Sequence, residues 1–293
     1  MQGKSFTRPC GLCLAILLGL AGLPARSQTA FYIPKSLITP VHTHQGELHL
    51  SVGRGGGYDA NVSYAFSRHF AAFATGTLKQ QTEARPSLFG GNTYDITRND
   101  YALKAGVGVF KLTRSRVFHL LESYAGLGMY RANNYVFNRE HPEWGRDYTQ
   151  ARFWNVFWQL QASSKFGRAE FTAAVRLAYS RYPHLYTWET DKGADVWDRY
   201  ENLGFYTVDP VVGKSLVLGR LKLNLQAGLS IVLDKARATE VSSRPSSSGI
   251  IVTAERKSIP HLLGAVLFRG AVQYNFDLRK AENRARPAIG ARE

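Results

Sequence analysis

Two stretches of the chain combine one histidine with several carboxylates. His141 is accompanied by Glu140, Glu143 and Asp147. His184 is followed by acids at four positions, Glu189, Asp191, Asp195 and Asp198. A carboxylate beside an imidazole suits acid–base chemistry or a divalent cation. Exposed charge is the commoner role of such residues, so we predict no catalytic residue, no metal site and no cofactor.

Aromatic residues gather in the same two stretches, and they make a binding surface the more specific expectation there. Glycans and proteins are the ligands that such a rim would suit, although anchoring at a membrane interface explains some of these aromatics equally well. We predict an external-loop surface that contains His141, Trp144, His184, Trp188 and Trp197.

Glycines form a second group of residues, and some of them resemble a functional motif. Residues 53–57 have the composition of a phosphate-binding loop, but neither the Lys-Ser/Thr pair nor a helix follows, which predicts a turn. Four other glycines lie in strand-like segments, where they would make room for neighbouring aromatic rings or permit bending. These are Gly106, Gly108, Gly126 and Gly128.

The elements that must position these residues are β-strands, because apolar and polar residues alternate with a period of two. In 58–66, for example, Tyr58, Val62 and Tyr64 share one face and Asp59 and Asn61 the other. We predict ten such strands, at 47–53, 58–66, 70–80, 101–109, 117–129, 154–163, 170–180, 206–213, 221–233 and 262–276. Pro210 is expected at a bulge.

The lengths of the links between these strands alternate. Short links are expected at 67–69, 111–116, 164–168 and 218–220, and long ones at 82–100, 132–150, 183–203 and 234–258. The link at 54–57 is the one exception, because it is short although it lies on the side of the long links. Residues 242–249 are expected to be flexible. Short turns on one side and long loops on the other are typical of an outer-membrane barrel. A soluble β-sandwich or a lipocalin-like barrel is the alternative, with the two faces exchanged.

After residue 30 the chain has no apolar run long enough for a membrane-spanning helix, so a closed barrel is the remaining way to cross a bilayer. The sequence predicts an all-β, closed, antiparallel up-and-down barrel of about ten strands with both termini in the periplasm. Its inward face would hold a polar network of Glu47, Asp59, Lys104, Glu122, Arg176, Asp209, Lys222 and Arg269. Bulky inward side chains favour a filled lumen.

The start of the chain predicts export. Lys4 and Arg8 precede an apolar run at 11–23, as in a secretory signal peptide. We predict a signal peptide at 1–27, a periplasmic leader at 28–43, the barrel at 44–276 and a basic periplasmic tail at 277–293. Both cysteines leave with residues 1–27, and the net charge falls from +15 to +12 with Lys4, Arg8 and Arg26.

The positive charge of an exported chain points to lipid rather than to nucleic acid. The expected partners are outer-membrane lipid, the phosphates of lipopolysaccharide and the barrel assembly machinery, and the ligand is unknown. We expect the outer membrane of a Gram-negative bacterium as the location.

Residues 46–73 (GELHLSVGRGGGYDANVSYAFSRHFAAF) resemble the first hairpins of small outer-membrane barrel proteins of the Bacteroidota. The Gly46-Glu47 pair, Gly57-Tyr58-Asp59 and the aromatic-Gly-x-Gly rhythm of 124–128 carry the resemblance. It implies location and fold, since activities in that group are mostly unassigned. The expected function is therefore a closed, porin-like barrel without enzymatic activity, whose external loops serve structure, surface binding or adhesion. The alternatives are a rim enzyme, either an omptin-like protease or a lipid-modifying hydrolase, and a narrow small-solute channel.

Overall fold

The computed structural model describes residues 37, 39–86, 93–115, 117–144, 146–191, 194–233, 236–246, 249–259 and 265–278. Its strands are β1 (Glu47–Arg54), β2 (Tyr58–Tyr64), β3 (Phe70–Pro86), β4 (Thr93–Leu112), β5 (Leu120–Asn138), β6 (Arg146–Phe166), β7 (Ala169–Asp191), β8 (Ala194–Leu218), β9 (Leu221–Val232), β10 (Ala236–Ser246), β11 (Gly249–Ile259) and β12 (Ala265–Asp277). One 3-10 turn, η1 (Pro142–Trp144), lies between β5 and β6.

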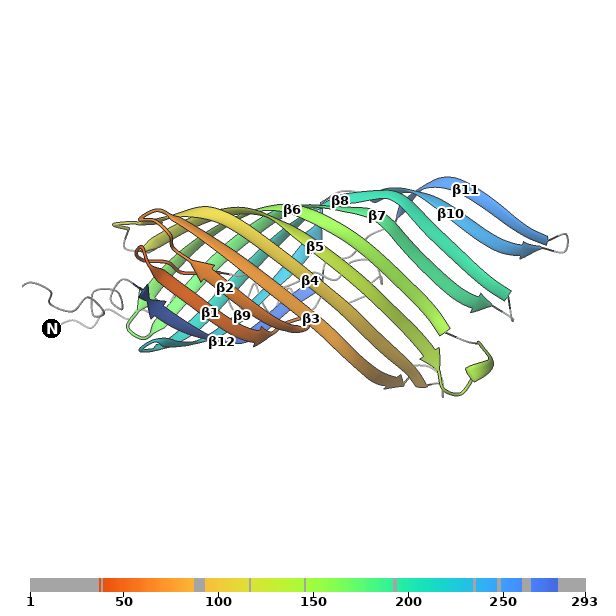
Figure 1. Ribbon diagram of the computed structural model, residues 1–293, viewed down its shortest axis with the longest axis horizontal. Helices are drawn as coiled ribbons and strands as arrows, with labels where there is room; N and C mark the ends of the chain where they lie inside the picture. The colour runs from red at the N-terminus through yellow and green to blue at the C-terminus, as the bar shows by residue number, and fades with distance from the viewer. Residues whose placement is uncertain are drawn as a thin grey trace, which may run out of the picture.

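Ten of these strands close into an antiparallel barrel. Strands β1 to β9 pair in sequence, and β12 pairs with both β9 and β1. The strands run obliquely to the long axis (Figure 1). Each of the ten predicted strands overlaps one strand of the barrel, so the predicted fold class is confirmed. The predicted signal peptide at 1–27 lies outside the described residues, as does the tail beyond residue 278.

The two faces of the wall are inverted relative to a soluble protein. Leu127 is 63% exposed on the outer face, whereas Arg176 and Asp209 are 2% and 0% exposed on the inner face. Every strand of the barrel contributes large apolar side chains to the outside. The lipocalin-like alternative requires the opposite arrangement, so the structure favours a barrel surrounded by lipid. Within the described residues, no helix is long and apolar enough to span a bilayer.

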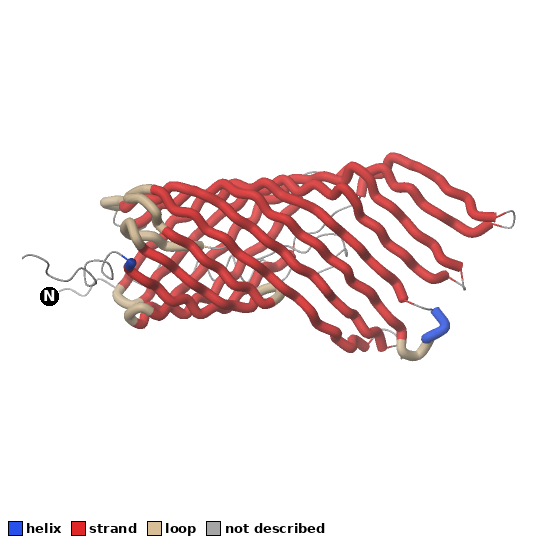
Figure 2. Tube along the Cα trace, viewed as in Figure 1, coloured by secondary structure: helices blue, strands red, loops and turns tan. Residues whose placement is uncertain are grey.

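The predicted long links were wrong in one respect: they are largely strands. Strands β3 to β8 are 17 to 25 residues long, well beyond the 9 to 11 that cross a bilayer. They continue past the closed barrel as a curved sheet (Figure 2). We call this sheet, with β10 and β11, the extension.

Strands β10 and β11 form a hairpin that the sequence reading missed, since 234–258 was expected to be a loop. β10 pairs with the far part of β8, with Ser243 opposite Trp197, so the hairpin belongs to the extension and not to the barrel (Figure 1). Residues 242–246, expected to be flexible, are the end of β10. The side chains of β10 are mostly polar on both faces, and β11 has the apolar residues Ile250, Ile251 and Val252 in succession, so neither strand has the alternation that identifies a strand.

Bulges mark the transition from barrel to extension. The β6–β7 register shifts by one residue between Arg152 and Trp154, beside Pro183, and the β8–β10 register shifts near Asn202. Asn202 has a φ of 57°, which asparagine tolerates better than most residues. The prediction of a bulge at Pro210 was wrong, because the β7–β8 register is continuous across that residue.

Candidate functional site

Three buried ion pairs lie on the inner face of the barrel wall, each between strands that are one or two places apart in the sheet. Arg176 lies 2.6 Å from Asp209, Lys222 lies 3.1 Å from Glu170, and Arg269 lies 2.5 Å from Asp59. All six side chains are at most 8% exposed. Buried charges are tolerated when they are paired in this way. Five of the eight predicted lumen residues are therefore members of ion pairs inside the barrel.

The other three predicted lumen residues lie inside as well. Glu122 is 3% exposed, and it accepts hydrogen bonds from the Tyr124 hydroxyl and the Gln161 amide. The Lys104 ammonium lies 5.4 Å from the centre of the Tyr130 ring, a cation–π distance. Glu47 accepts hydrogen bonds from the backbone and hydroxyl of Thr43.

The described part of the predicted periplasmic leader lies within the barrel. Leu37 and His42 are 1% and 0% exposed, Gln226 donates to the Thr39 hydroxyl, and Gln161 donates to the Pro40 carbonyl. A cavity of only about 20 Å³ lies beside Thr39 and Pro40. A cavity of that size has room for about one water molecule. Leader and wall thus fill this part of the lumen.

Aromatic rings fill two further levels of the lumen. Phe73 contacts Tyr124 and Phe157 at centroid distances of 5.4 and 6.0 Å. The predicted role of the glycines is confirmed beside them, because a Cβ on Gly126 would lie 2.5 Å from Phe157.

The second aromatic level crosses four adjacent strands, and the sequence reading missed it. Tyr130, Phe153, Tyr182 and Phe205 follow one another with centroid distances of 4.4, 4.3 and 5.8 Å, and each is at most 6% exposed. The signal was available, since each residue continues the inward phase of its own strand.

The predicted external-loop residues lie on the extension, and the structure brings only some of them together. Trp188 and Trp197 are directly opposite each other in the β7–β8 ladder. Trp144 is in η1, and the backbone of His184 pairs with that of Arg152. His141 lies at the β5–β6 turn, 3.0 Å from Glu143.

The electrostatics of the His141 turn keep its carboxylates ionised. The pKa of Glu143 is lowered by a hydrogen bond from its own backbone N–H and by His141. The pKa of Glu140 is lowered because the carboxylate accepts the Thr93 backbone N–H at 2.5 Å. Both side chains are exposed. A general acid needs a raised pKa, whereas the pKa values of Glu140 and Glu143 are lowered, so neither carboxyl suits that role.

A row of aromatic residues crosses the extension. Tyr135, Tyr148, Trp188 and Trp197 occupy successive cross-strand positions on β5, β6, β7 and β8. Tyr186 stacks on Trp188 at 5.6 Å. All five side chains are partly exposed. Such a row offers flat, amphipathic contact area to a ligand or to the membrane interface.

Two arginines lie where the outer apolar face ends. On β5 the exposed Met129 is followed two residues later by Arg131, and on β6 Trp154 is preceded by Arg152. Arg131 and Arg152 are directly opposite each other, which is unfavourable for like charges unless an anion lies between them. They border a hollow of about 330 Å³ that Tyr101 and Tyr186 also line.

No protein-family model and no curated protein matches the sequence. Among solved structures, the chain is similar to the translocator domain of autotransporter NalP from Neisseria meningitidis, with 13% identity over 78% of this chain and 86% of that one and a TM-score of 0.42. It is also similar to CarO and CarO2 from Acinetobacter baumannii. CarO has 10% identity, coverage of 79% and 98%, and a TM-score of 0.30. CarO2 has 10% identity, coverage of 79% and 97%, and a TM-score of 0.33.

Proposed function

We propose that the protein is a non-enzymatic outer-membrane barrel with a filled lumen, and that its extension is the working surface. The observation that carries this proposal is the change of the outer face along β5 and β6. It is apolar up to Met129 and Trp154, and then it becomes basic and aromatic. Acyl chains suit the first part, and water, headgroups and surface ligands suit the second.

The partner with the best chemical fit at the boundary is a phosphate of lipopolysaccharide in the outer leaflet. Guanidinium groups bind phosphate through paired, charge-assisted hydrogen bonds. An anion in the hollow between Arg131 and Arg152 would also relieve the repulsion of their like charges. The association with lipopolysaccharide and the origin in the Bacteroidota both belong to this proposal.

Replacing both arginines tests the lipid partner. The double variant Arg131→Gln/Arg152→Gln should retain at least threefold less lipopolysaccharide than the wild-type protein when both are purified in mild detergent and the lipid phosphate is quantified. The matched control is Arg114→Gln/Arg168→Gln, which removes two exposed arginines at the short-turn end of the barrel. Equal retention by the two double variants would refute the arginine site.

The location has an independent test in a heat-modifiability gel on membrane fractions. A folded outer-membrane barrel should migrate differently before and after boiling and should sediment with the outer membrane. Recovery in the soluble periplasmic fraction would refute the proposal.

The alternative functions gain no support from the described residues. The lumen is filled beside the leader and at two aromatic levels, which disfavours a small-solute channel. A rim hydrolase based on His141 and His184 predicts that a double replacement by Ala abolishes hydrolysis of a lipid or peptide panel. We expect no such hydrolysis in either protein.

A further inference from the structure

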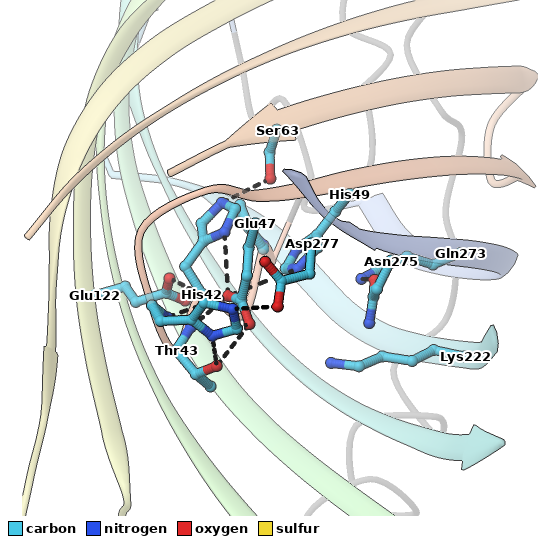
Figure 3. A network of polar contacts seen from close by, with 12 residues as sticks. His42, Thr43, Glu47, His49, Ser63, Glu122, Lys222, Gln273, Asn275 and Asp277 are labelled. Carbon is cyan, nitrogen blue, oxygen red and sulfur yellow. Dashed lines mark hydrogen bonds and ion pairs between the residues drawn. The ribbon is translucent and has the colours of Figure 1, made fainter. Parts of the chain in front are cut away.

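Two histidines and a carboxylate meet at the short-turn end of the lumen. His42 comes from the leader, while Glu47 and His49 come from the start of β1 (Figure 3). The side chains of His42 and His49 are 0% and 5% exposed, and that of Glu47 is 13% exposed. One donor atom from each residue lies within 4.8 Å of the other two. The sequence analysis predicted no metal site and did not consider His42, which lies in the predicted periplasmic leader at 28–43.

The cluster has unused donor capacity. The Nδ1 atom of His42, which is the ring nitrogen nearer to Glu47, is buried and has no hydrogen-bond partner. On the His49 ring the nitrogen nearer to Glu47 is Nε2. A buried nitrogen without a partner is costly, and each such atom requires an explanation. On the other side of the His42 ring, Nε2 lies 2.8 Å from the Ser63 hydroxyl. If Nε2 carries the proton and donates it to Ser63, the Nδ1 lone pair is free on the side that faces Glu47.

We propose that His42, Glu47 and His49 bind one divalent transition-metal ion of the zinc class. Two imidazoles and one carboxylate, with a fourth position left for water, are a ligand set typical of zinc. Carboxylate oxygen Oε2 of Glu47 lies 3.8 Å from His42 Nδ1 and 3.9 Å from His49 Nε2. Tetrahedral zinc bonds place donor atoms roughly 3.3 Å apart, so these two separations need to close by about half an ångström. The two imidazole nitrogens, which lie within 4.8 Å of each other, also have to approach.

Binding also requires one ring to move. The two imidazoles stack with an interplanar angle of 12° and a centroid distance of 4.4 Å, and one ion cannot lie in both planes. His42 is the ring that tilts, because it belongs to the leader and not to the hydrogen-bonded wall. The ion has a route to the site past His44, whose side chain is 49% exposed and is held by Glu47 and Asp277 at 2.9 and 3.3 Å.

The bound ion would join the leader to the barrel wall. In the described part of the leader, polar contacts to the wall come from Gln226, Gln161, Glu122, Ser63 and Glu47. Coordination by His42 adds a metal bond at the point where the leader meets β1. The site therefore acts as a clamp that keeps the leader in the lumen, and metal binding stabilises the folded protein by mass action.

The test measures Zn²⁺ binding to the purified, EDTA-treated barrel in detergent by competition with a chromophoric chelator. The wild-type protein should bind one equivalent with a dissociation constant of about 1 µM or tighter. The variants His42→Gln and His49→Gln should each bind at least ~100-fold more weakly, since each removes a ligand and even an outer-shell loss costs 10- to 100-fold. Co²⁺ should give the intense visible absorption of a four-coordinate site in the wild-type protein and in neither of these two variants.

Matched controls separate this site from casual binding by surface histidines. His69→Gln and His141→Gln remove exposed or partly exposed histidines outside the cluster and should leave the affinity unchanged. His42→Gln is the decisive variant, because it leaves the wall intact and the unboiled gel band confirms the folded barrel. Absence of stoichiometric binding in the wild-type protein, or unchanged affinity in folded His42→Gln, would overturn the proposal. Neither result bears on lipid binding at Arg131 and Arg152.

Discussion

At the scale of residues, breaking the ion pair of Arg176 and Asp209 should lower the free energy of unfolding the most. Both side chains are at most 3% exposed, and Ser230 donates a further hydrogen bond to Asp209. Removing one partner of a buried pair leaves an unpaired charge and costs about 3–5 kcal/mol. Asp209→Ala should lower the free energy of unfolding by that amount, measured by urea titration in lipid vesicles. The double variant Arg176→Met/Asp209→Leu should recover most of the loss, and equal stability of the two variants would contradict the ion-pair account.

Gly126 carries the second prediction at this scale. A Cβ there would clash with the Ala105 carbonyl oxygen and would also lie 2.5 Å from Phe157, whereas a Cβ on Gly76 would meet its nearest neighbour, Leu103, at 3.6 Å. Overpacking a filled core costs about 1–3 kcal/mol. Gly126→Ala should therefore lower the free energy of unfolding within that range, with Gly76→Ala close to the wild-type protein in the same titration. Equal effects of the two variants would show that the Phe157 level is loosely packed.

Residue positions inside the strands could be predicted from the sequence, and positions outside them could not. Asp59, Arg176 and Lys222 lie in alternating segments, so their phase predicted the inward face. Their pairing with Arg269, Asp209 and Glu170 depends on strand register, which alternation leaves open. His42 has no such phase, because it precedes the first strand. The cluster with His49 therefore needed the structure.

At the scale of elements, the hairpin of β10 and β11 is separable from the barrel. It lies between β9 and β12 in the sequence, yet those two strands pair with each other, with Ser230 opposite Ala265. Replacing residues 234–262 with a short turn should leave the barrel closed, because none of the wall's strand pairs is lost. The truncated protein should keep the unboiled gel shift and should lose any cell-surface binding activity of the parent. Loss of the gel shift would show that the hairpin is needed for folding.

The elements of the barrel could be predicted and those of the extension could not, for one physical reason. Between lipid and lumen, a strand must be apolar on one face and polar on the other. Apolar and polar residues therefore alternate with a period of two in β1 to β9. Beyond the lipid, both faces of β7 and β8 can meet water. Residues such as Thr187 and Asp198 pair across the strands without any alternation that reveals them.

At the scale of the whole molecule, the protein is a barrel with a lipid-facing outer wall and a lumen that its own side chains fill. Leader residues and two aromatic levels occupy the lumen. Purified protein in planar bilayers should therefore show no discrete conductance steps. Regular conductance steps in repeated reconstitutions would contradict the filled lumen. They would not affect the conclusion that the outer face is apolar and faces lipid.

The most direct measurement concerns that outer face. A fluorescent label is attached to a single cysteine at Leu127→Cys or Gln150→Cys in protein expressed without residues 1–27, which hold both native cysteines. Both positions are exposed, the first on the apolar outer face of the barrel and the second on the extension. Brominated acyl chains should quench the label at 127, and aqueous iodide should quench the label at 150. Iodide quenching at 127 without quenching by the brominated lipid would contradict a lipid-facing outer wall.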